Sequence, residues 1–129
     1  MPTLFTRIIK GEIPSVRILE DEKLFAFLDI RPINPGHTLV VPKLEVDSLW
    51  EVPPDTLAGM LPFAQKVSKA VQAATGCRRM GVLVAGFEVP HAHMHLVPIE
   101  DEGELTFSRA RPASPEDLQA MGQRIRERL

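Results

Sequence analysis

The sequence predicts an α+β fold, with a mainly antiparallel five-stranded sheet and helices. Three observations predict it. Short runs rich in β-branched and aromatic residues are separated by turns that contain proline, glycine or acidic residues; one long segment repeats apolar residues at every third or fourth position; and a segment opened by serine and proline ends the chain. Because its 129 residues contain no internal repeat, the chain is interpreted as one domain, 1–129.

The first half of the chain is expected to form one short helix and three strands. Thr3 can cap a helix that continues to Lys10, and Gly11 follows its end. Two prolines and a glycine make residues 31–36 a loop. The three predicted strands are residues 15–21, 23–30 and 37–42.

The second half is expected to begin with the longest element, a helix from about Pro54 to Thr75 that stops at Gly76. Pro62 lies inside it, so a kink or a later start of the helix stays open. Pro115 suits the first position of a final helix, which has acidic residues in its first turn and arginines in its last. The other predicted elements are strands 80–86 and 91–97, which can pair as a hairpin, and the final helix itself, about 115–128.

The composition narrows the classes of partner and the expected compartment. A net charge of −2 gives no broad basic surface, which argues against nucleic acid and anionic membranes as partners but allows a small anionic ligand at a local site. Cys77 is the only cysteine, so neither an intrachain disulfide nor a CxxC metal site is expected. Residues 1–14 contain no long apolar run, so we expect neither a signal peptide nor a membrane span, and a cytoplasmic setting.

Three of the four histidines lie at alternate positions, His91, His93 and His95. Side chains alternate between the two faces of a strand, so these imidazoles are expected on one face, with Ala92 and Met94 on the opposite, core-facing side. The exposed face of an edge strand would account for a single histidine. Three at a strict spacing of two, flanked by apolar residues, indicate a functional site.

Spacing alone leaves two kinds of chemistry open. Alternate histidines can share a zinc ion, with a carboxylate such as Glu88, Asp29 or Glu45 as a further ligand. Alternatively, a neutral imidazole can attack phosphorus directly while its neighbours orient it and donate hydrogen bonds to the phosphoryl oxygens. In that case a backbone carbonyl that accepts from Nδ1–H of His93 would leave Nε2 free to attack, and activity would fall below a pH of about 6.5.

A wider pattern resembles the histidine triad (HIT) family. The segment HAHMHLV is a full match to the family signature, in which three histidines alternate with apolar residues. The segments that resemble the nucleotide-binding proteins of this family are, in order, LFTRIIKGEIP (4–14), EDEKLFAFLDIRPINPGHTLVVPK (20–43) and AGFEVPHAHMHLVP (85–98). The resemblance implies the HIT-like fold and a homodimer with one continuous sheet.

The resemblance also implies a role for each matching residue. His93 matches the nucleophile, which attacks the α-phosphorus of a nucleotide and forms a covalent nucleotidyl-histidine. His95 matches the residue that contacts the phosphate, and His37 and His91 match supporting histidines. The positions that match the rest of the nucleotide site are Asp29 for the ribose hydroxyls, Ile30 beside it, and Phe5, Ile8, Ile13 and Phe27 for the base.

One departure from the family pattern concerns a metal. Many relatives bind a structural zinc ion through two N-terminal cysteines and a further histidine. The corresponding positions in this sequence are Thr3, Thr6 and Glu45, so no zinc is expected.

A second departure lies in the loop before the histidines. This loop is short and keeps Gly86 for close approach of the backbone, but Phe87 and Glu88 stand where relatives often carry polar groups near the phosphate. An acid close to a phosphate is electrostatically unfavourable. The residues of this loop are therefore expected to affect which leaving group is preferred and how fast the substrate is turned over.

These residues together predict a nucleotide-binding hydrolase or transferase that uses no metal and no cofactor. Its predicted substrate is a purine nucleoside phosphoramidate, or a related phosphate ester or anhydride, attacked by His93. A dinucleoside polyphosphate is a weaker alternative because no basic cluster stands ready for additional phosphates. Two further alternatives stay open: a nucleotide-binding module without turnover, and a metal-dependent enzyme.

Overall fold

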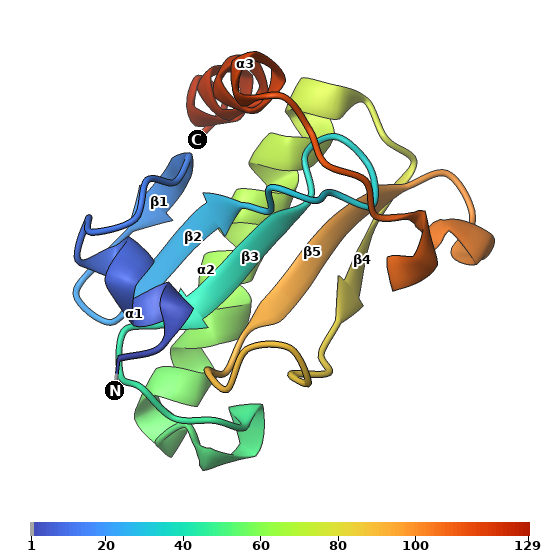
Figure 1. Cartoon of the computed structure of the whole chain (residues 1–129). Coiled ribbons are helices and arrows are strands. Elements are labelled where there is room, and N and C mark those ends of the chain that lie inside the picture. Colours follow the sequence, from blue (N-terminus) through green and yellow to red (C-terminus); the bar gives the residue numbers. More distant parts are fainter. Residues whose placement is uncertain (1) are drawn as a thin grey trace.

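The computed structural model describes residues 2–129, which form a five-stranded antiparallel sheet of order β1-β2-β3-β5-β4 (Figure 1). The strands are β1 Arg17–Glu20, β2 Leu24–Leu28, β3 Thr38–Pro42, β4 Arg79–Leu83 and β5 Met94–Ile99. The helices are α1 Leu4–Ile9, α2 Pro54–Thr75 and α3 Pro115–Arg126, with short 3-10 turns η1 Leu49–Glu51, η2 Glu102–Glu104 and η3 Phe107–Arg109. The predicted fold class and order of elements are confirmed, whereas the three 3-10 turns were not predicted.

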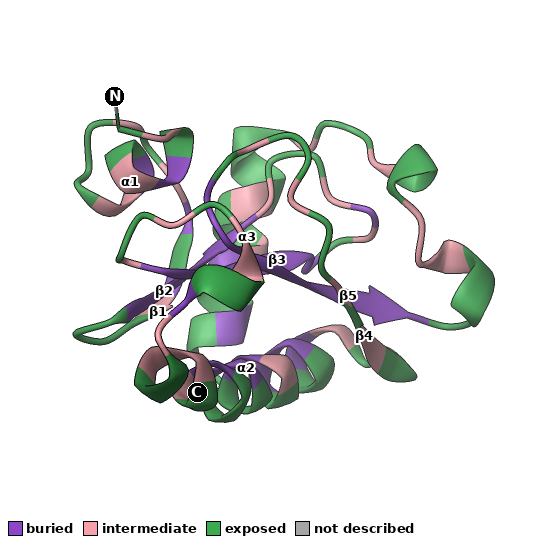
Figure 2. Ribbon diagram, turned by 90° about the horizontal axis from the view of Figure 1, so that it is seen from below, coloured by how far each residue is buried: buried purple, intermediate pink, exposed green. Residues whose placement is uncertain are grey.

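The central strands are buried on both faces, which explains the unbroken apolar run LFAFL in β2. Because side chains alternate, Leu24, Ala26 and Leu28 pack in the core beneath α2. Phe25 and Phe27 point the other way and pack against α1. Figure 2 shows these layers, with α2 and α3 on one side of the sheet and α1 on the other.

The long helix α2 has the predicted bounds. Pro54 occupies its first turn, where a missing backbone N–H costs nothing, and Gly76 takes the left-handed conformation, with φ of 71°, that ends the helix. The helix runs unbroken through the exposed Pro62, so it does not start later. Neither α2 nor any other helix within residues 2–129 is both long and apolar enough to cross a bilayer.

The start of the strand that carries the histidines was predicted wrongly. β5 begins at Met94 rather than at His91, so His91 and His93 precede the regular strand. The reason is that pairing of β3 with β5 reaches back only to Met94, and the backbone N–H of Ala92 donates to the carbonyl of Val46 instead (2.7 Å). The predicted alternation of faces nevertheless holds, because Ala92 and Met94 pack in the core beneath α2 while His93 lies on the opposite face.

Two glycines shape the loops beside the sheet. Gly86 has a positive φ of 84°, and the chain leaves the sheet before it, so β4 ends at Leu83 rather than at 86. Gly36 has a φ of 101°, and a Cβ added there would lie 3.1 Å from Thr75 and 3.2 Å from Val71 of α2. Gly36 thus lets the loop 31–36 lie against α2 and sets the position of the residue that follows it.

Candidate active site

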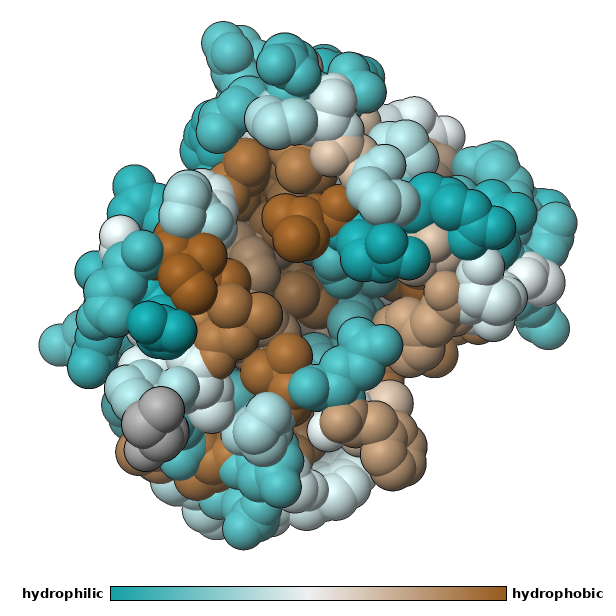
Figure 3. All heavy atoms as spheres, in the orientation of Figure 1, coloured by the Kyte–Doolittle hydropathy of each residue, from teal (hydrophilic) through white to brown (hydrophobic). Residues whose placement is uncertain are grey.

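A cavity of about 430 Å³ on the α1 side of the sheet collects residues from distant parts of the chain. In the space-filling view it is a hollow lined by apolar side chains (Figure 3). Ten of the twelve predicted site residues line it, namely Phe5, Ile8, Ile13, Phe27, Asp29, Ile30, Gly86, Glu88, His93 and His95. The other two, His37 and His91, are 1% and 0% exposed and lie behind the cavity wall.

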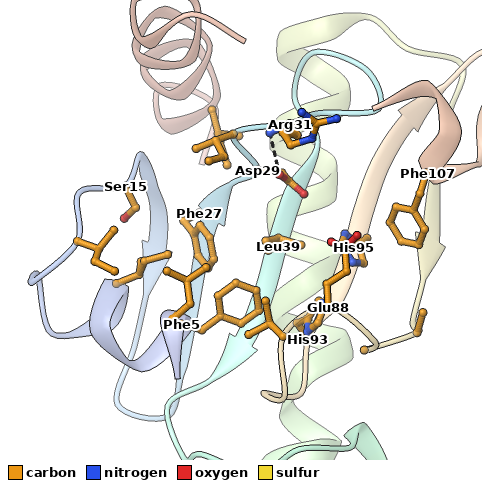
Figure 4. A pocket seen from close by; sticks show the side chains of 18 of the residues that line it. Phe5, Ser15, Phe27, Asp29, Arg31, Leu39, Glu88, His93, His95 and Phe107 are labelled. Atoms are coloured by element: carbon orange, nitrogen blue, oxygen red, sulfur yellow. Dashed lines mark hydrogen bonds between the residues drawn. The ribbon is translucent and has the colours of Figure 1, made fainter. Parts of the chain in front are cut away.

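One end of the cavity is apolar and is formed by α1 and the sheet (Figure 4). Thr3 caps α1 by accepting a hydrogen bond from the N–H of Thr6 (3.1 Å), and the three-residue spacing of Phe5 and Ile8 turns both toward the sheet. The rings of Phe5 and Phe27 meet edge to face with centroids 5.5 Å apart. This end of the cavity can enclose a flat, apolar group.

His93 lies next to this apolar end, with its ring centroid 5.0 Å from that of Phe5. Its Nδ1 is 2.6 Å from the carbonyl oxygen of His91, which can only accept, so Nδ1 carries the proton. The backbone contact expected from the sequence is therefore present, and Nε2 has a free lone pair. Burial lowers the pKa of His93, and the hydrogen bond to the carbonyl opposes this only in part, so the ring is neutral at pH 7.

The proton positions on two further rings follow from a chain of hydrogen bonds. The N–H of Ile33 donates to Nδ1 of His37 (2.9 Å), so the proton of His37 is on Nε2. That Nε2 lies 2.9 Å from Nδ1 of His95 and donates to it, which places the proton of His95 on its Nε2. Burial lowers the pKa of His37 to about 4. Burial, with repulsion from His37 and His93, lowers the pKa of His95 to about 3.

His93 and His95 therefore present complementary groups at one place. Their ring centroids are 4.9 Å apart, and both rings line the cavity. One ring has an unprotonated nitrogen and the other an N–H that is not used in the chain of hydrogen bonds. The arrangement thus places a nitrogen that is able to act as a nucleophile beside an N–H that is able to donate a hydrogen bond to an anion.

Asp29 directly follows β2, and hydrogen bonds to the backbone of His37 and Arg31 hold it in place. Its N–H donates to the carbonyl of His37 (3.0 Å), and its Oδ1 accepts from the N–H of Arg31 (2.9 Å; dashed in Figure 4). Oδ2 lies 3.6 Å from Nε2 of His37. Burial raises the pKa of Asp29, the hydrogen bond from Arg31 opposes the rise, and the negative charge of Glu88 adds to it. The carboxylate closes the turn after β2 and still lines the cavity.

Comparison with known proteins identifies the family to which this site belongs. The model of the HIT domain matches residues 10–102. The chain belongs to the HIT family. An adenosine 5'-monophosphoramidase of Schizosaccharomyces pombe is 35% identical to it over 136 residues, which cover 100% of this chain and 99% of that protein.

Solved structures of HIT proteins share the fold. The chain superimposes on a HIT-like protein of Bartonella henselae with a TM-score of 0.88 at 33% identity, over 98% of this chain and 96% of that one. A zinc-bound histidine triad family protein of Mycobacterium smegmatis gives a TM-score of 0.81 at 32% identity, over 96% and 90%. The predicted HIT-like fold is confirmed.

The three alternating histidines of this HIT chain are not arranged to share a metal ion. His91 uses both ring nitrogens, since its Nε2–H donates to the carbonyl of Pro42 (2.8 Å) and its Nδ1 accepts from the hydroxyl of Thr3 (2.7 Å). His91 is also absent from the cavity wall that His93 and His95 share. The alternative of a three-histidine metal site therefore conflicts with the donor geometry.

Another group in the described residues has the composition of a metal site. Ligand-type atoms of Asp29, His37 and His95 lie within 4.8 Å of one another. However, Nε2 of His37 carries the proton that it donates to His95, because its Nδ1 is occupied as an acceptor. A metal-binding imidazole nitrogen must be unprotonated, so these residues suit a hydrogen-bonded pair of rings better than an ion.

Sequence reasoning missed several residues that line the HIT site. Leu39 lies two positions after His37 and shares its strand face, so alternation along the strand was a usable signal. The ring of Phe107, from η3, lies 4.8 Å from that of His95, and no local pattern marks this contact. Arg31 is the one arginine or lysine that lines the cavity in the described part of the chain.

Proposed function

We propose that this chain is a nucleotidyl hydrolase or transferase that cleaves purine nucleoside phosphoramidates through a covalent nucleotidyl group on His93. The observation that supports this most directly is the free lone pair of His93 Nε2 next to the N–H of His95 in one cavity. A neutral imidazole held in this tautomer is a nucleophile, and the neighbouring N–H can stabilise negative charge on the phosphoryl oxygens. The name of the relative from S. pombe describes an activity of this class.

The parts of the cavity match the parts of such a substrate. The apolar end beside α1 suits a purine base, because flat rings pack well between aromatic and aliphatic side chains. A carboxylate next to it suits the two ribose hydroxyls. The residues proposed to bind the nucleotide are Phe5, Ile8, Ile13 and Phe27 for the base, Asp29 and Ile30 for the ribose, and Gly86 and Glu88 beside the phosphate.

The proposed reaction has two steps, each balanced in atoms and charge. In the first, the bond between His93 Nε2 and phosphorus forms, the P–N bond to the leaving amine breaks, and the amine takes a proton from solvent. In the second, water attacks phosphorus, the bond to Nε2 breaks, and one proton is released to solvent. The Nδ1–H of His93 stays on the carbonyl of His91 throughout and shares the positive charge of the adduct.

The charges around the cavity favour a small neutral or cationic leaving group. The lining includes the carboxylates of Asp29 and Glu88, and Arg31 is the one arginine or lysine that residues 2–129 contribute to it. A polyphosphate leaving group would bring several negative charges close to these carboxylates with little compensation. A phosphoramidate releases an amine and avoids this repulsion.

We also propose a cytoplasmic homodimer in which β4 extends the sheet into a second copy. β4 is an edge strand, and Val82 on it and Val84 after it are 47% and 44% exposed. Cys77 is the only cysteine and has no partner for an intrachain disulfide, as expected in a reducing compartment. Light scattering should give twice the chain mass and a lower mass for Val82→Lys; a monomeric wild-type chain would contradict the dimer.

Steady-state hydrolysis of adenosine 5'-phosphoramidate tests the proposed activity. The wild-type chain should release adenosine monophosphate and ammonia, and His93→Gln should lose at least about a thousandfold in kcat because the nucleophile is gone. Calorimetry with adenosine monophosphate is the control, since His93→Gln should still bind it within a few-fold. Binding without turnover by the wild-type chain would favour a nucleotide-binding module, and turnover by His93→Gln would contradict the proposal.

A further inference from the structure

A hydrogen-bonded network lies behind the cavity, where the N-terminal segment meets the residues that follow β3 (Figure 1). One carboxylate oxygen of Glu45, Oε1, accepts from the backbone N–H of Thr3 (2.8 Å) and from the hydroxyl of Thr6 (2.6 Å). The hydroxyl of Thr3 lies 2.7 Å from Nδ1 of His91. These contacts bring together residues that are 39 to 88 positions apart in the sequence.

The directions of these hydrogen bonds are fixed by the groups involved. Nε2 of His91 lies 2.8 Å from the carbonyl of Pro42, which only accepts, so the proton of a neutral His91 is on Nε2. Nδ1 of His91 is therefore an acceptor, and the hydroxyl of Thr3 donates to it. The buried ring is thus held at both nitrogens, and the histidine's own carbonyl accepts from Nδ1–H of His93 (2.6 Å).

The geometry points to Thr3 and Glu45 as positioning residues for the nucleophile. We infer that the carboxylate of Glu45 holds Thr3, that Thr3 holds the ring of His91, and that His91 thereby presents its carbonyl to His93. The inference rests on the proposed function, since it assigns His93 as the group to be positioned. Catalysis would then also depend on Thr3 and Glu45, which do not line the cavity.

As expected from the sequence, the same residues do not suit the structural zinc ion that many relatives bind at the corresponding positions. Threonine hydroxyls are not among the usual ligands of zinc, which prefers thiolate, imidazole and carboxylate groups. The groups of Thr3, Thr6 and Glu45 are also hydrogen-bonded directly to one another at 2.6–3.1 Å. In this chain, hydrogen bonds among protein groups take the place of metal coordination behind His91.

The position of the His91 carbonyl matters because charge develops on His93 during the reaction. When Nε2 bonds to phosphorus, the ring becomes cationic and its Nδ1–H becomes a stronger donor. A carbonyl already aligned with this N–H stabilises the adduct without a further reorganisation. Loss of one such alignment should reduce kcat about five- to tenfold, the effect of one ordinary hydrogen bond.

Substitutions that remove one hydrogen bond at a time test the inference. Thr3→Val keeps the size of the side chain and removes the donor to His91, whereas Thr3→Ser keeps the hydroxyl. Glu45→Ala removes the carboxylate without touching the helix cap that Thr3 provides. We expect Thr3→Val and Glu45→Ala to lower kcat about five- to tenfold, with the KM change in Glu45→Ala below twofold, and Thr3→Ser to restore kcat.

Nuclear magnetic resonance gives a readout that does not depend on turnover. In the wild-type chain, nitrogen shifts should show His91 protonated on Nε2 and His93 on Nδ1, with a slowly exchanging Nδ1–H proton on His93. In Thr3→Val, that proton should exchange faster. This readout tests the positioning role separately from the proposed activity. A chain without turnover would refute the activity, whereas the exchange rate of the His93 Nδ1–H proton would still show whether Thr3 positions the ring.

A variant that loses a different helix cap serves as the control. Ser114, which is not among the residues that line the cavity, caps α3 by accepting from the N–H of Asp117 (3.1 Å), so Ser114→Ala also removes a helix cap. It should lower the melting temperature while leaving kcat and the His93 proton unchanged. Unchanged kcat and proton exchange in both Thr3→Val and Glu45→Ala, or an equal loss of kcat in Ser114→Ala, would overturn the inference.

Discussion

The protein should lose stability already between pH 7 and pH 5, which is above the range in which ordinary carboxylates titrate. His37 and His95 are buried as neutral rings with pKa values of about 4 and about 3, against 6.5 for the free side chain. Between pH 6.5 and these values the unfolded chain binds both protons and the folded chain does not, so the free energy of unfolding falls as the pH falls. From pH 7 to pH 5 each ring should cost about 2 kcal/mol, and the two together about 4 kcal/mol.

Two other groups near the cavity modify this loss in known directions. The lowered pKa of His93 acts in the same sense, because its folded ring also resists protonation. The raised pKa of Asp29 acts in the opposite sense, since the folded carboxyl takes up a proton before the unfolded one does, and it offsets part of the loss near pH 4. Between pH 7 and pH 5 His93 therefore adds to the loss from the histidine pair, whereas the offset from Asp29 comes at lower pH.

Urea unfolding followed by circular dichroism at pH 7, 6 and 5 measures this loss. His37→Gln is the matched variant, because it removes one of the buried neutral rings, and it should reduce the loss between pH 7 and pH 5 by about 2 kcal/mol. A free energy of unfolding that changes by less than about 0.5 kcal/mol over this range would refute the assignment of two buried neutral rings.

Three further predictions concern the cavity and its supports. Because burial lowers the pKa of His93, the acidic limb of kcat/KM should have its midpoint below pH 6.5, and a midpoint at or above 6.5 would contradict this. Asp29→Asn should lower kcat/KM about 10- to 100-fold for an adenosine phosphoramidate but hardly change it for the 2',3'-dideoxy analogue; equal losses would exclude a ribose contact. Gly36→Ala should lower the free energy of unfolding by about 1–2 kcal/mol, because φ at this position is 101° and the added Cβ would meet Thr75 and Val71. Thermal unfolding measures this, and unchanged stability would show that the loop relaxes freely.

The elements whose signals are local were well predicted from the sequence. The bounds of α2 followed from its apolar stripe and from Gly76, and the capping role of Thr3 followed from its residue type before a short helix. Ten of the twelve residues named from the histidine row and the family resemblance line one cavity. Alternation along an extended chain correctly separated His93 from Met94 even though the regular strand starts only at the latter.

The features that the sequence did not reveal depend on contacts between distant segments. The start of β5 is set by where Ala92 finds a hydrogen-bond partner, and that partner, Val46, belongs to a loop with no strand signal. The contact of Phe107 with His95 requires the fold of the segment after β5. Proton positions on the buried rings likewise follow only from acceptors and donors such as the N–H of Ile33.

A rapid-quench experiment with adenosine 5'-phosphoramidate tests whether His93 forms a covalent bond to phosphorus during turnover. Enzyme and substrate are mixed for milliseconds, quenched in base to preserve phosphorus–nitrogen bonds to histidine, and the digested chain is analysed by mass spectrometry. We expect an adenylyl group on His93 that forms and is lost at rates consistent with kcat and that is absent from His93→Gln. Turnover without any adduct, or an adduct on another residue that turns over at the rate of kcat, would contradict this expectation.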